Sequence, residues 1–394
     1  MTRSIDRAVN LEDIRLLAKR RLPRIAFDFI DGGVNGEECL DRNRQAFRRH
    51  TLVPRYLVNI EQRDQSTELF GRRYASPLGI SPAGLAGLMW PDADRLLAEA
   101  AAEANIPFMM SAAACISIEE AARIAPSTTW FQVYGTRNPD IVDDQVRRAA
   151  DCGVQVLVLT VDVPIVPRRE RNVRNGFRRP MKFTPARVIE GLAHPAWLMG
   201  FLKNGVPPLA NWFAYAPPGA DKNAVADVFG ANTPAPGQEW PALERIRRLW
   251  KGHLIVKGIL HPSDARRAVE AGADGLMVSN HGGRQLDCAP SPLEMIGTIR
   301  AASGEDVTLL MDSGVRRGSD VLIARCLGAQ ACFFARPTLF GAAAAGKAGI
   351  ARVIEIVRGE IDLVMGQLGC AEMSAMDSSW LTRTILDEAG ETTA

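Results

Sequence analysis

Eight short apolar segments constrain the fold of this chain more than any other feature of its sequence, and all but the fourth are followed directly by a stretch with helical periodicity. Both faces of these segments are expected to be buried, as they are in parallel strands covered by helices. Eight strand–helix units are the number found in a (β/α)8 TIM barrel. A doubly wound open sheet is the alternative, but no GxGxxG motif follows the first segment. The strands are expected at residues 77–80, 108–110, 130–133, 156–159, 254–257, 275–278, 308–311 and 331–334.

The rest of the chain is predicted to complete one domain of 394 residues around this barrel. We expect an N-terminal helical segment at 1–76, the barrel at 77–164 and 241–365, a long excursion after the fourth strand at 165–240, and a C-terminal tail at 366–394. Barrel helices are expected at 92–105, 117–125, 139–151, 262–271, 290–302, 318–327 and 341–357.

The excursion at residues 165–240 starts at the end of the barrel where active sites are built. Its first part is basic, and its second part is rich in tryptophan, phenylalanine and proline. We interpret it as a lid over the site. A disordered insertion and contact with a membrane surface through residues 190–215 are the alternatives. The basic residues are Arg168, Arg169, Arg171, Arg174, Arg178, Arg179 and Lys182.

Composition argues against several other classes of protein. A formal net charge of +2 gives no argument for nucleic-acid binding. Seven cysteines without a CxxC pair indicate neither a disulfide framework nor a zinc module. The N-terminus lacks the apolar core of a signal peptide, and no window of about twenty residues is apolar enough to span a bilayer. The sequence therefore predicts a cytoplasmic protein, with peripheral attachment to the inner membrane as the alternative.

Polar residues follow nearly every predicted strand, and the ends of barrel strands surround one cavity. The turn SNHGGRQLD places His281 and Arg284 three residues apart around two glycines. A base and a carboxylate-binding cation in that arrangement could address one small acid together. The alternative is a loop in which both residues cap the next helix. The other residues at strand ends are Ser81, Ser111, Gln132, Tyr134, Thr160, Asp162, Lys257, Ser279, Asp312 and Arg336.

The last two strands end in small residues and arginines, in the runs Asp312–Arg316 and Ala335–Pro337. Barrels often bind a phosphate group after their seventh and eighth strands. The position of these residues therefore predicts a cofactor that carries a phosphate.

Several long motifs in a fixed order resemble those of the FMN-dependent L-2-hydroxy acid oxidising family. They are LPRIAFDFIDGG, ISPAGLAG, WFQVYG, LTVDVP, LIVKGI, SNHGGRQLD, LMDSGVRRGSD and RPTLFG, and they cover nearly the whole chain. The family includes glycolate oxidase, L-lactate dehydrogenase and (S)-mandelate dehydrogenase, and GLAGLMWP and SNHGGRQLDC are most similar to the mandelate dehydrogenase versions. The resemblance implies an FMN-binding (β/α)8 barrel, often a homotetramer, that oxidises an (S)-2-hydroxy acid and passes electrons to oxygen or a quinone.

The resemblance also implies a role for each matching residue. His281 would be the catalytic base and Asp312 its hydrogen-bond partner. Arg169 and Arg284 would bind the substrate carboxylate, and Tyr134 would donate to a substrate oxygen. Lys257 would stabilise the reduced flavin. The flavin ring would be held by Pro82, Ala83, Gly84, Ser111, Gln132, Thr160 and Ser279, and the ribityl phosphate by Asp312, Ser313, Gly314, Arg316, Ala335 and Arg336.

Three positions bear on the substrate and the cofactor. Phe29 stands where most members have a tyrosine that binds the substrate carboxylate, and loss of one hydrogen bond to a charged group removes about 1.5–3 kcal/mol. Ala335 replaces a glycine of the phosphate site. Gly84, where glycolate-type members have alanine, leaves room for a larger 2-substituent. The sequence thus predicts an aryl or bulky 2-hydroxy acid as substrate.

Three other functions remain open at this point. An L-lactate dehydrogenase or a hydrogen peroxide-forming oxidase has the same motifs. A catalytically silent flavin-binding barrel is supported only by Phe29 and Ala335. An FMN-dependent enzyme acting on a diphosphate is disfavoured by the HGGR turn and the paired arginines.

Overall fold

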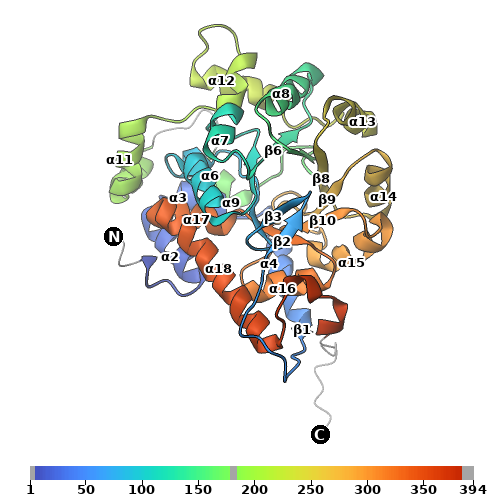
Figure 1. Ribbon diagram of the computed structural model, residues 1–394. Coiled ribbons are helices and arrows are strands. Elements are labelled where there is room, and N and C mark those ends of the chain that lie inside the picture. The colour runs from blue at the N-terminus through green and yellow to red at the C-terminus, as the bar shows by residue number, and fades with distance from the viewer. Residues whose placement is uncertain (1–4, 178–183, 384–394) are drawn as a thin grey trace.

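The structure is a computed structural model that describes residues 5–177 and 184–383. Eight parallel strands form a closed barrel in the order β10-β11-β4-β5-β6-β7-β8-β9 (Figure 1). The closed barrel confirms the (β/α)8 prediction, and the open-sheet alternative is wrong. The strands are β4 (Leu78–Ile80), β5 (Phe108–Ser111), β6 (Thr129–Tyr134), β7 (Val156–Thr160), β8 (His253–Ile259), β9 (Gly275–Val278), β10 (Thr308–Met311) and β11 (Ala331–Phe334).

Helices surround the barrel nearly where the sequence predicts them, and capping side chains mark the N-termini of several of them. The hydroxyl of Ser117 accepts from the backbone N–H of Glu120, and Asn138 accepts from that of Asp140. The predicted helix 341–357 is wrong, since Gly346 at φ 62° separates two helices there. The barrel helices are α6 (Ala93–Ala104), α7 (Ile118–Ile124), α8 (Pro139–Asp151), α13 (Trp240–Leu249), α14 (Pro262–Glu270), α15 (Pro292–Ser303), α16 (Gly318–Cys326), α17 (Arg336–Ala345) and α18 (Lys347–Leu368).

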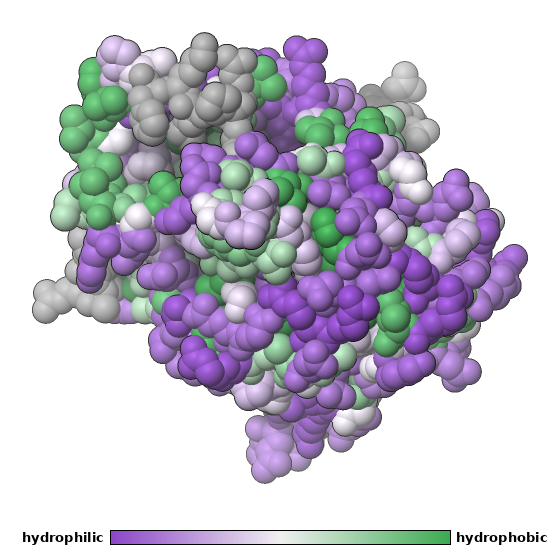
Figure 2. Space-filling model, turned by 90° about the horizontal axis from the view of Figure 1, so that it is seen from above, coloured by the Kyte–Doolittle hydropathy of each residue, from purple (hydrophilic) through white to green (hydrophobic). Residues whose placement is uncertain are grey.

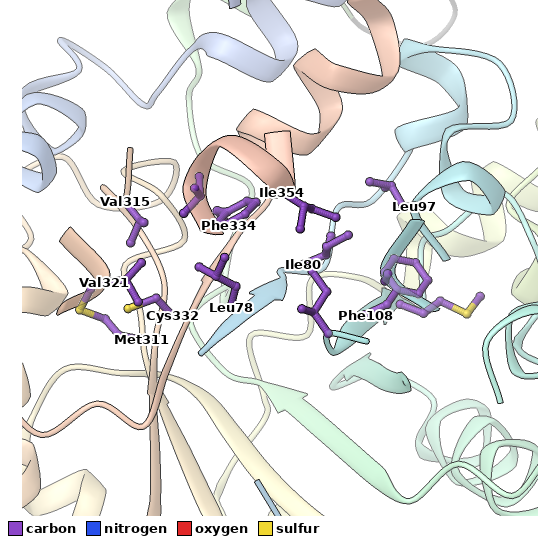
Figure 3. Packing of buried hydrophobic residues seen from close by; sticks show 14 of the residues in the cluster. Leu78, Ile80, Leu97, Phe108, Met311, Val315, Val321, Cys332, Phe334 and Ile354 are labelled. Atoms are coloured by element: carbon purple, nitrogen blue, oxygen red, sulfur yellow. The ribbon is translucent and has the colours of Figure 1, made fainter. Parts of the chain in front are cut away.

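Alternate residues of each strand belong to two separate cores. Leu78 and Ile80 of β4 lie with Phe334 of β11 against Leu97 of α6 and Ile354 of α18 (Figure 3). The other set fills the interior of the barrel and forms its own cluster. Side chains of a strand alternate between faces with a period of two, so one sequence serves both cores. The interior cluster contains Met109, Trp130, Val156, Val158, Ile255, Met277, Leu310, Ala331 and Phe333.

The N-terminal segment combines helices with short strands, so its prediction as a helical segment holds only for the first half. Pro23 separates α2 from α3. Leu69 and Tyr74, from a β-hairpin, join the interior cluster of the barrel. The elements are α2 (Leu11–Arg21), α3 (Arg24–Asp31), α4 (Glu38–Gln45), η1 (Ala46–Arg49), β1 (His50–Leu52), β2 (Thr67–Leu69) and β3 (Arg72–Tyr74), and β1 pairs with β12 (Leu381–Arg383) of the C-terminal segment.

The excursion after β7 is folded in its described part, so the disordered alternative is wrong there. The indole N–H of Trp197 donates to the carbonyl of Met89 at 3.0 Å, and that of Trp212 donates to Ala112 at 2.9 Å. The hydroxyl of Tyr215 donates to Asp144 at 2.7 Å. The elements are α9 (Glu170–Asn175), α10 (Pro185–Ala193), α11 (Pro195–Asn204), η2 (Ala210–Tyr215) and α12 (Lys222–Asn232), whereas Arg178, Arg179, Lys182 and the end of the predicted tail lie outside the described residues.

The length and hydropathy of the helices decide whether any of them could span a membrane. Among the helices of residues 5–177 and 184–383, none is both long and apolar enough to cross a membrane.

Gly79 offers a test of the packing beneath the site. A Cβ atom at this position would lie 2.2 Å from the ring of Phe333, which is fully buried. Overpacking of this kind typically costs about 1–3 kcal/mol, so Gly79→Ala should lower the melting temperature measured by circular dichroism. The control is Gly359→Ala in α18, where no described atom lies within 4 Å and the melting temperature should not fall. A Gly79→Ala protein as stable as the wild type would contradict this packing.

Candidate active site

A cavity of about 530 Å³ opens at the C-terminal end of the barrel. Its walls come from strand ends, from α3 and from the excursion. Four predicted site residues, Ser111, Gln132, Thr160 and Ser279, are buried without lining it in the described chain. The structure brings the other predicted residues together in its walls: Phe29, Pro82, Ala83, Gly84, Tyr134, Arg169, Lys257, His281, Arg284, Asp312, Ser313, Gly314, Arg316, Ala335 and Arg336.

Polar side chains at the base of the site form what we call the polar ring. Six of its seven members lie two positions beyond a residue of the interior cluster, and Ser81 lies two positions beyond Gly79, so the period of two puts each of them on the inner face. Hydrogen bonds join neighbouring members, since Ser111 donates to the amide oxygen of Gln132 at 3.0 Å and Lys257 donates to Ser279 at 2.7 Å. The polar ring consists of Ser81, Ser111, Gln132, Thr160, Lys257, Ser279 and Asp312.

Lys257 is the only cation of the polar ring, and it is almost fully buried. Its Nζ lies 3.1 Å from Oδ2 of Asp312, which also accepts from the hydroxyl of Ser81 at 3.1 Å. Burial alone would lower the pKa of Lys257, but the carboxylates of Asp312 and Asp162 outweigh it and raise the pKa above its usual value. The lysine is therefore charged at neutral pH.

His281 pairs with Asp162, and the prediction that Asp312 is its partner is wrong. Nδ1 of His281 lies 2.9 Å from Oδ1 of Asp162. Both residues lie one layer above the polar ring, two positions beyond Ser279 and Thr160, whereas Asp312 belongs to the ring itself. Burial, together with the nearby charges of Lys257 and Arg169, holds the pKa of His281 below its usual value despite the carboxylate. The imidazole is thus neutral at pH 7, and a proton on Nδ1 leaves Nε2 free to accept another.

Two arginines face the cavity beside this pair. Nη1 of Arg284 donates to the carbonyls of Phe29 and Gly32 at 2.7 and 3.0 Å, and its guanidinium carbon lies 5.0 Å from the centre of the Phe29 ring. Nε of Arg169 donates to the backbone oxygen of Arg284 at 3.4 Å. Burial lowers the pKa of both arginines. Two desolvated cations at one wall favour an anionic ligand.

The residues present fit FMN in two separate ways. Among the described residues, Nε2 of Gln132 and Oγ1 of Thr160 are buried without a hydrogen-bond partner, as expected where the polar edge of a ring binds. At the other end, burial and repulsion from neighbouring arginines lower the pKa of Arg316 to about 9 and that of Arg336 to about 10. A phosphate group would supply the missing counter-charge. Gly314, at φ 89°, lets the loop pass close to Asn43 beside these arginines.

A closed barrel with these features defines a flavin-dependent oxidoreductase that acts on small acids. The comparisons agree, because residues 18–383 match the model of the FMN-dependent dehydrogenase family. The chain belongs to this family, and its cofactor is FMN.

Three relatives illustrate the range of the family. The chain is 39% identical to (S)-mandelate dehydrogenase of Pseudomonas putida, over 94% of this chain and 93% of that protein. It is 36% identical to L-lactate dehydrogenase of Pseudomonas syringae pv. syringae, over 95% of this chain and 98% of that protein. A crystal structure of the monotopic membrane protein (S)-mandelate dehydrogenase superposes with a TM-score of 0.92 at 38% identity, covering 96% of this chain and all of that one.

Several residues of the site were missed or given no role from the sequence. Ser81 and Asp162 are among the strand-end residues that the sequence indicates, but it gives them no role, although each lies on the inward-facing register of its strand. Phe177, Val173 and Phe229 of the excursion also line the cavity. No periodic signal in the sequence links these three residues to the barrel, because their placement depends on how the excursion folds back.

The arginine pair Arg316 and Arg317 provides a matched test of the phosphate site. Arg316 lines the cavity, whereas the side chain of its neighbour Arg317 is 58% exposed and pairs with Glu360. Replacing a charged partner of the phosphate removes about 1.5–3 kcal/mol, so Arg316→Gln should weaken FMN binding roughly 10- to 150-fold. Arg317→Gln should leave it within about twofold. Quenching of FMN fluorescence by the apoprotein measures both; equal effects of the two substitutions would argue against a phosphate at Arg316.

Proposed function

We propose that this protein oxidises an (S)-2-hydroxy acid with an aryl or other bulky 2-substituent to the 2-oxo acid. The observation that carries this proposal is the neutral His281, oriented by Asp162 and facing the same cavity as Arg169 and Arg284. A base beside a carboxylate clamp is what the removal of hydrogen from a 2-hydroxy acid requires. FMN, when bound, accepts the two electrons that leave the α-carbon.

Six residues of the site have a defined part in the proposed reaction. Arg169 and Arg284 bind the carboxylate, and the hydroxyl of Tyr134 donates to a substrate oxygen. Nε2 of His281 takes one proton, from either the substrate hydroxyl or the α-carbon, and Asp162 stabilises the imidazolium that forms. Lys257 supplies positive charge where negative charge develops on the cofactor.

The cavity wall supports a bulky substrate. Phe29 packs against Phe177 with ring centres 4.7 Å apart, and Val166, Val173 and Phe229 line the same cavity. Gly84 also lines it, and a Cβ there would come within 3.1 Å of Ala113. An aryl group gains more than a methyl group from such apolar surroundings, at about 25 cal/mol per Å² of buried surface. L-Lactate is the second candidate, because lactate dehydrogenases are among the relatives.

The decisive experiment is anaerobic flavin reduction. Purified yellow protein is mixed separately with (S)-mandelate, L-lactate and glycolate, and the flavin absorbance is followed. Mandelate should bleach the flavin fastest, and the rate of recolouring after air is admitted distinguishes oxygen from a quinone as the natural acceptor.

His281→Gln is the control for the chemistry. It should slow bleaching by roughly 10²–10⁴-fold, the usual contribution of a positioned base, and leave the spectrum of bound flavin unchanged. Undiminished reduction by this variant would refute His281 as the base. No bleaching of the wild type by any of the three acids would favour the silent flavin-binding barrel.

We also propose that the protein attaches to a membrane surface through α10 and α11. Neither helix has a buried residue. Hydrophobic side chains gather along the left edge of the molecule in Figure 2, the side on which α11 lies in Figure 1. Exposed apolar side chains of this kind suit a helix that lies in a membrane interface. The similar (S)-mandelate dehydrogenase of known structure is described as a monotopic membrane protein. The residues, each 50–69% exposed, are Val188, Ile189, Leu192, Met199 and Leu202.

Vesicle flotation tests this attachment. The double variant Ile189→Gln and Leu192→Gln should lose most of its binding to vesicles of phosphatidylglycerol and phosphatidylcholine, since each lost apolar contact is worth about 1.5–3 kcal/mol. Leu363→Gln on α18, where the leucine is equally exposed, is the control and should bind like the wild type. Equal flotation of all three proteins would rule out these helices as the anchor. The cytoplasmic location and the homotetramer stay predictions.

A further inference from the structure

The last turn of α3 contacts two of the cavity arginines through its backbone. The carbonyl oxygens of Phe29 and Gly32 accept from Nη1 of Arg284 at 2.7 and 3.0 Å. Those of Ile30 and Gly32 accept from Nε and Nη2 of Arg336, each at 2.9 Å. Carbonyl groups at the C-terminus of a helix carry partial negative charge and lack partners within the helix. The end of α3 therefore fixes where these two guanidinium groups lie.

Side chains of the N-terminal segment tie α3 to α9 through Arg171. Its Nη1 lies 2.9 Å from Oδ2 of Asp31 and 3.8 Å from Oδ1 of Asp28. Its Nη2 donates to Oε2 of Glu37. Asn175, near the end of α9, donates to Oδ2 of Asp28. Arg171 thus joins three carboxylates of one segment to the first turn of another.

Arg169 and Arg171 flank the start of α9 on opposite sides. Arg169 immediately precedes the helix and lines the cavity, where its Nε donates to the backbone of Arg284. Arg171, in the first turn of the helix, is not among the residues that line the cavity, and its side chain contacts Asp31 and Glu37 instead. Any shift of α9 relative to α3 therefore moves Arg169 relative to Arg284.

We propose that Arg171 is a positioning residue that sets the separation of Arg169 and Arg284 and so tunes their grip on the substrate carboxylate. In the described part of the chain Arg171 does not line the cavity, so it acts through these two arginines. The inference rests on the proposed function, because it presupposes a carboxylate ligand.

The chemistry of the guanidinium group supports this assignment. A planar fork can bridge several carboxylates, whereas an ammonium group acts as a point charge. Asp31, whose side chain is only 6% exposed, also pairs with Arg15 at 2.6 Å, so its charge stays compensated without Arg171. Loss of Arg171 would instead remove the ion pairs that α9 makes with Asp31 and Glu37, and so loosen the contact between α9 and the N-terminal segment.

The test compares a carboxylate ligand with its neutral amide. Phenylacetate and phenylacetamide share a ring and carry no hydroxyl to be oxidised, and the shift in flavin absorbance of the holoenzyme gives a Kd for each. The variants are Arg171→Gln and Arg171→Lys. Arg174→Gln is the matched control, since Arg174 lies on the same helix with its side chain 68% exposed and pairs with Glu170.

Arg171→Gln should weaken phenylacetate at least tenfold and phenylacetamide less than twofold. Arg171→Lys should weaken phenylacetate as well, by a smaller factor, while Arg174→Gln should leave both constants unchanged. The proposal is overturned if Arg171→Gln leaves the ratio of the two constants at its wild-type value, whether both are unaffected or both weaken in parallel.

Loss of FMN from the variant and tight binding of the amide by the wild type each have a defined meaning. If Arg171→Gln does not retain FMN, the same two dissociation constants are measured for Glu37→Gln. This substitution removes one charge from the contact with Arg171. The new amide oxygen can still accept from the backbone N–H of Gly33, which lies 2.9 Å from Oε1 of Glu37. An unchanged ratio in that variant and in Arg171→Lys overturns the proposal. A wild-type protein that binds the amide as tightly as the acid contradicts the proposed function itself.

Discussion

The buried ammonium group of Lys257 is the charge around which the mouth of the barrel is arranged. An isolated ammonium ion in such a place would cost several kcal/mol. Asp312 and Ser279 contact it directly, and Ser81 and Ser313 in turn donate to Asp312. These groups come from β8, β9, β10 and β4, which are far apart in the sequence. Only a closed barrel brings all of them to one point, so closure of the sheet is a condition for the site.

Beyond the polar ring, positive charge exceeds negative charge. Arg169, Arg284, Arg316 and Arg336 face one cavity, and burial lowers the pKa of each. The nearby carboxylates of the N-terminal segment are engaged by Arg171. Arg284 and Arg336 are instead held by backbone carbonyls at the end of α3, which carry only partial charge. The cavity thus favours anions, which we propose to be a phosphate at one end and a carboxylate at the other.

Much of this arrangement could be predicted from the sequence, because a barrel turns linear order into position. Apolar runs gave the strands, and the polar residue beyond each run gave the polar ring. The prediction of Asp312 as the partner of His281 is wrong, because a motif does not by itself give the layer in which a side chain lies. His281 lies two residues beyond Ser279 and Asp162 two beyond Thr160, so both stand one layer above Asp312. That count was possible from the sequence. The placement of Phe177 and of α3 was not, since it depends on contacts between segments that share no periodic pattern.

Phe29 illustrates the difference between identifying a residue and knowing its effect. The family resemblance indicated a lost hydroxyl group and weaker carboxylate binding. In the structure the ring lies between Phe177 and the guanidinium of Arg284. A cation–π contact of this kind is worth about 0.5–2 kcal/mol and holds Arg284 against α3 without forming a hydrogen bond. The nitrogens of Arg284 that we propose to bind the carboxylate are then bordered by an apolar wall. An acid that carries an aromatic ring near its carboxylate can contact the guanidinium of Arg284 and the apolar wall at the same time. A smaller acid such as glycolate has no group that packs against this wall.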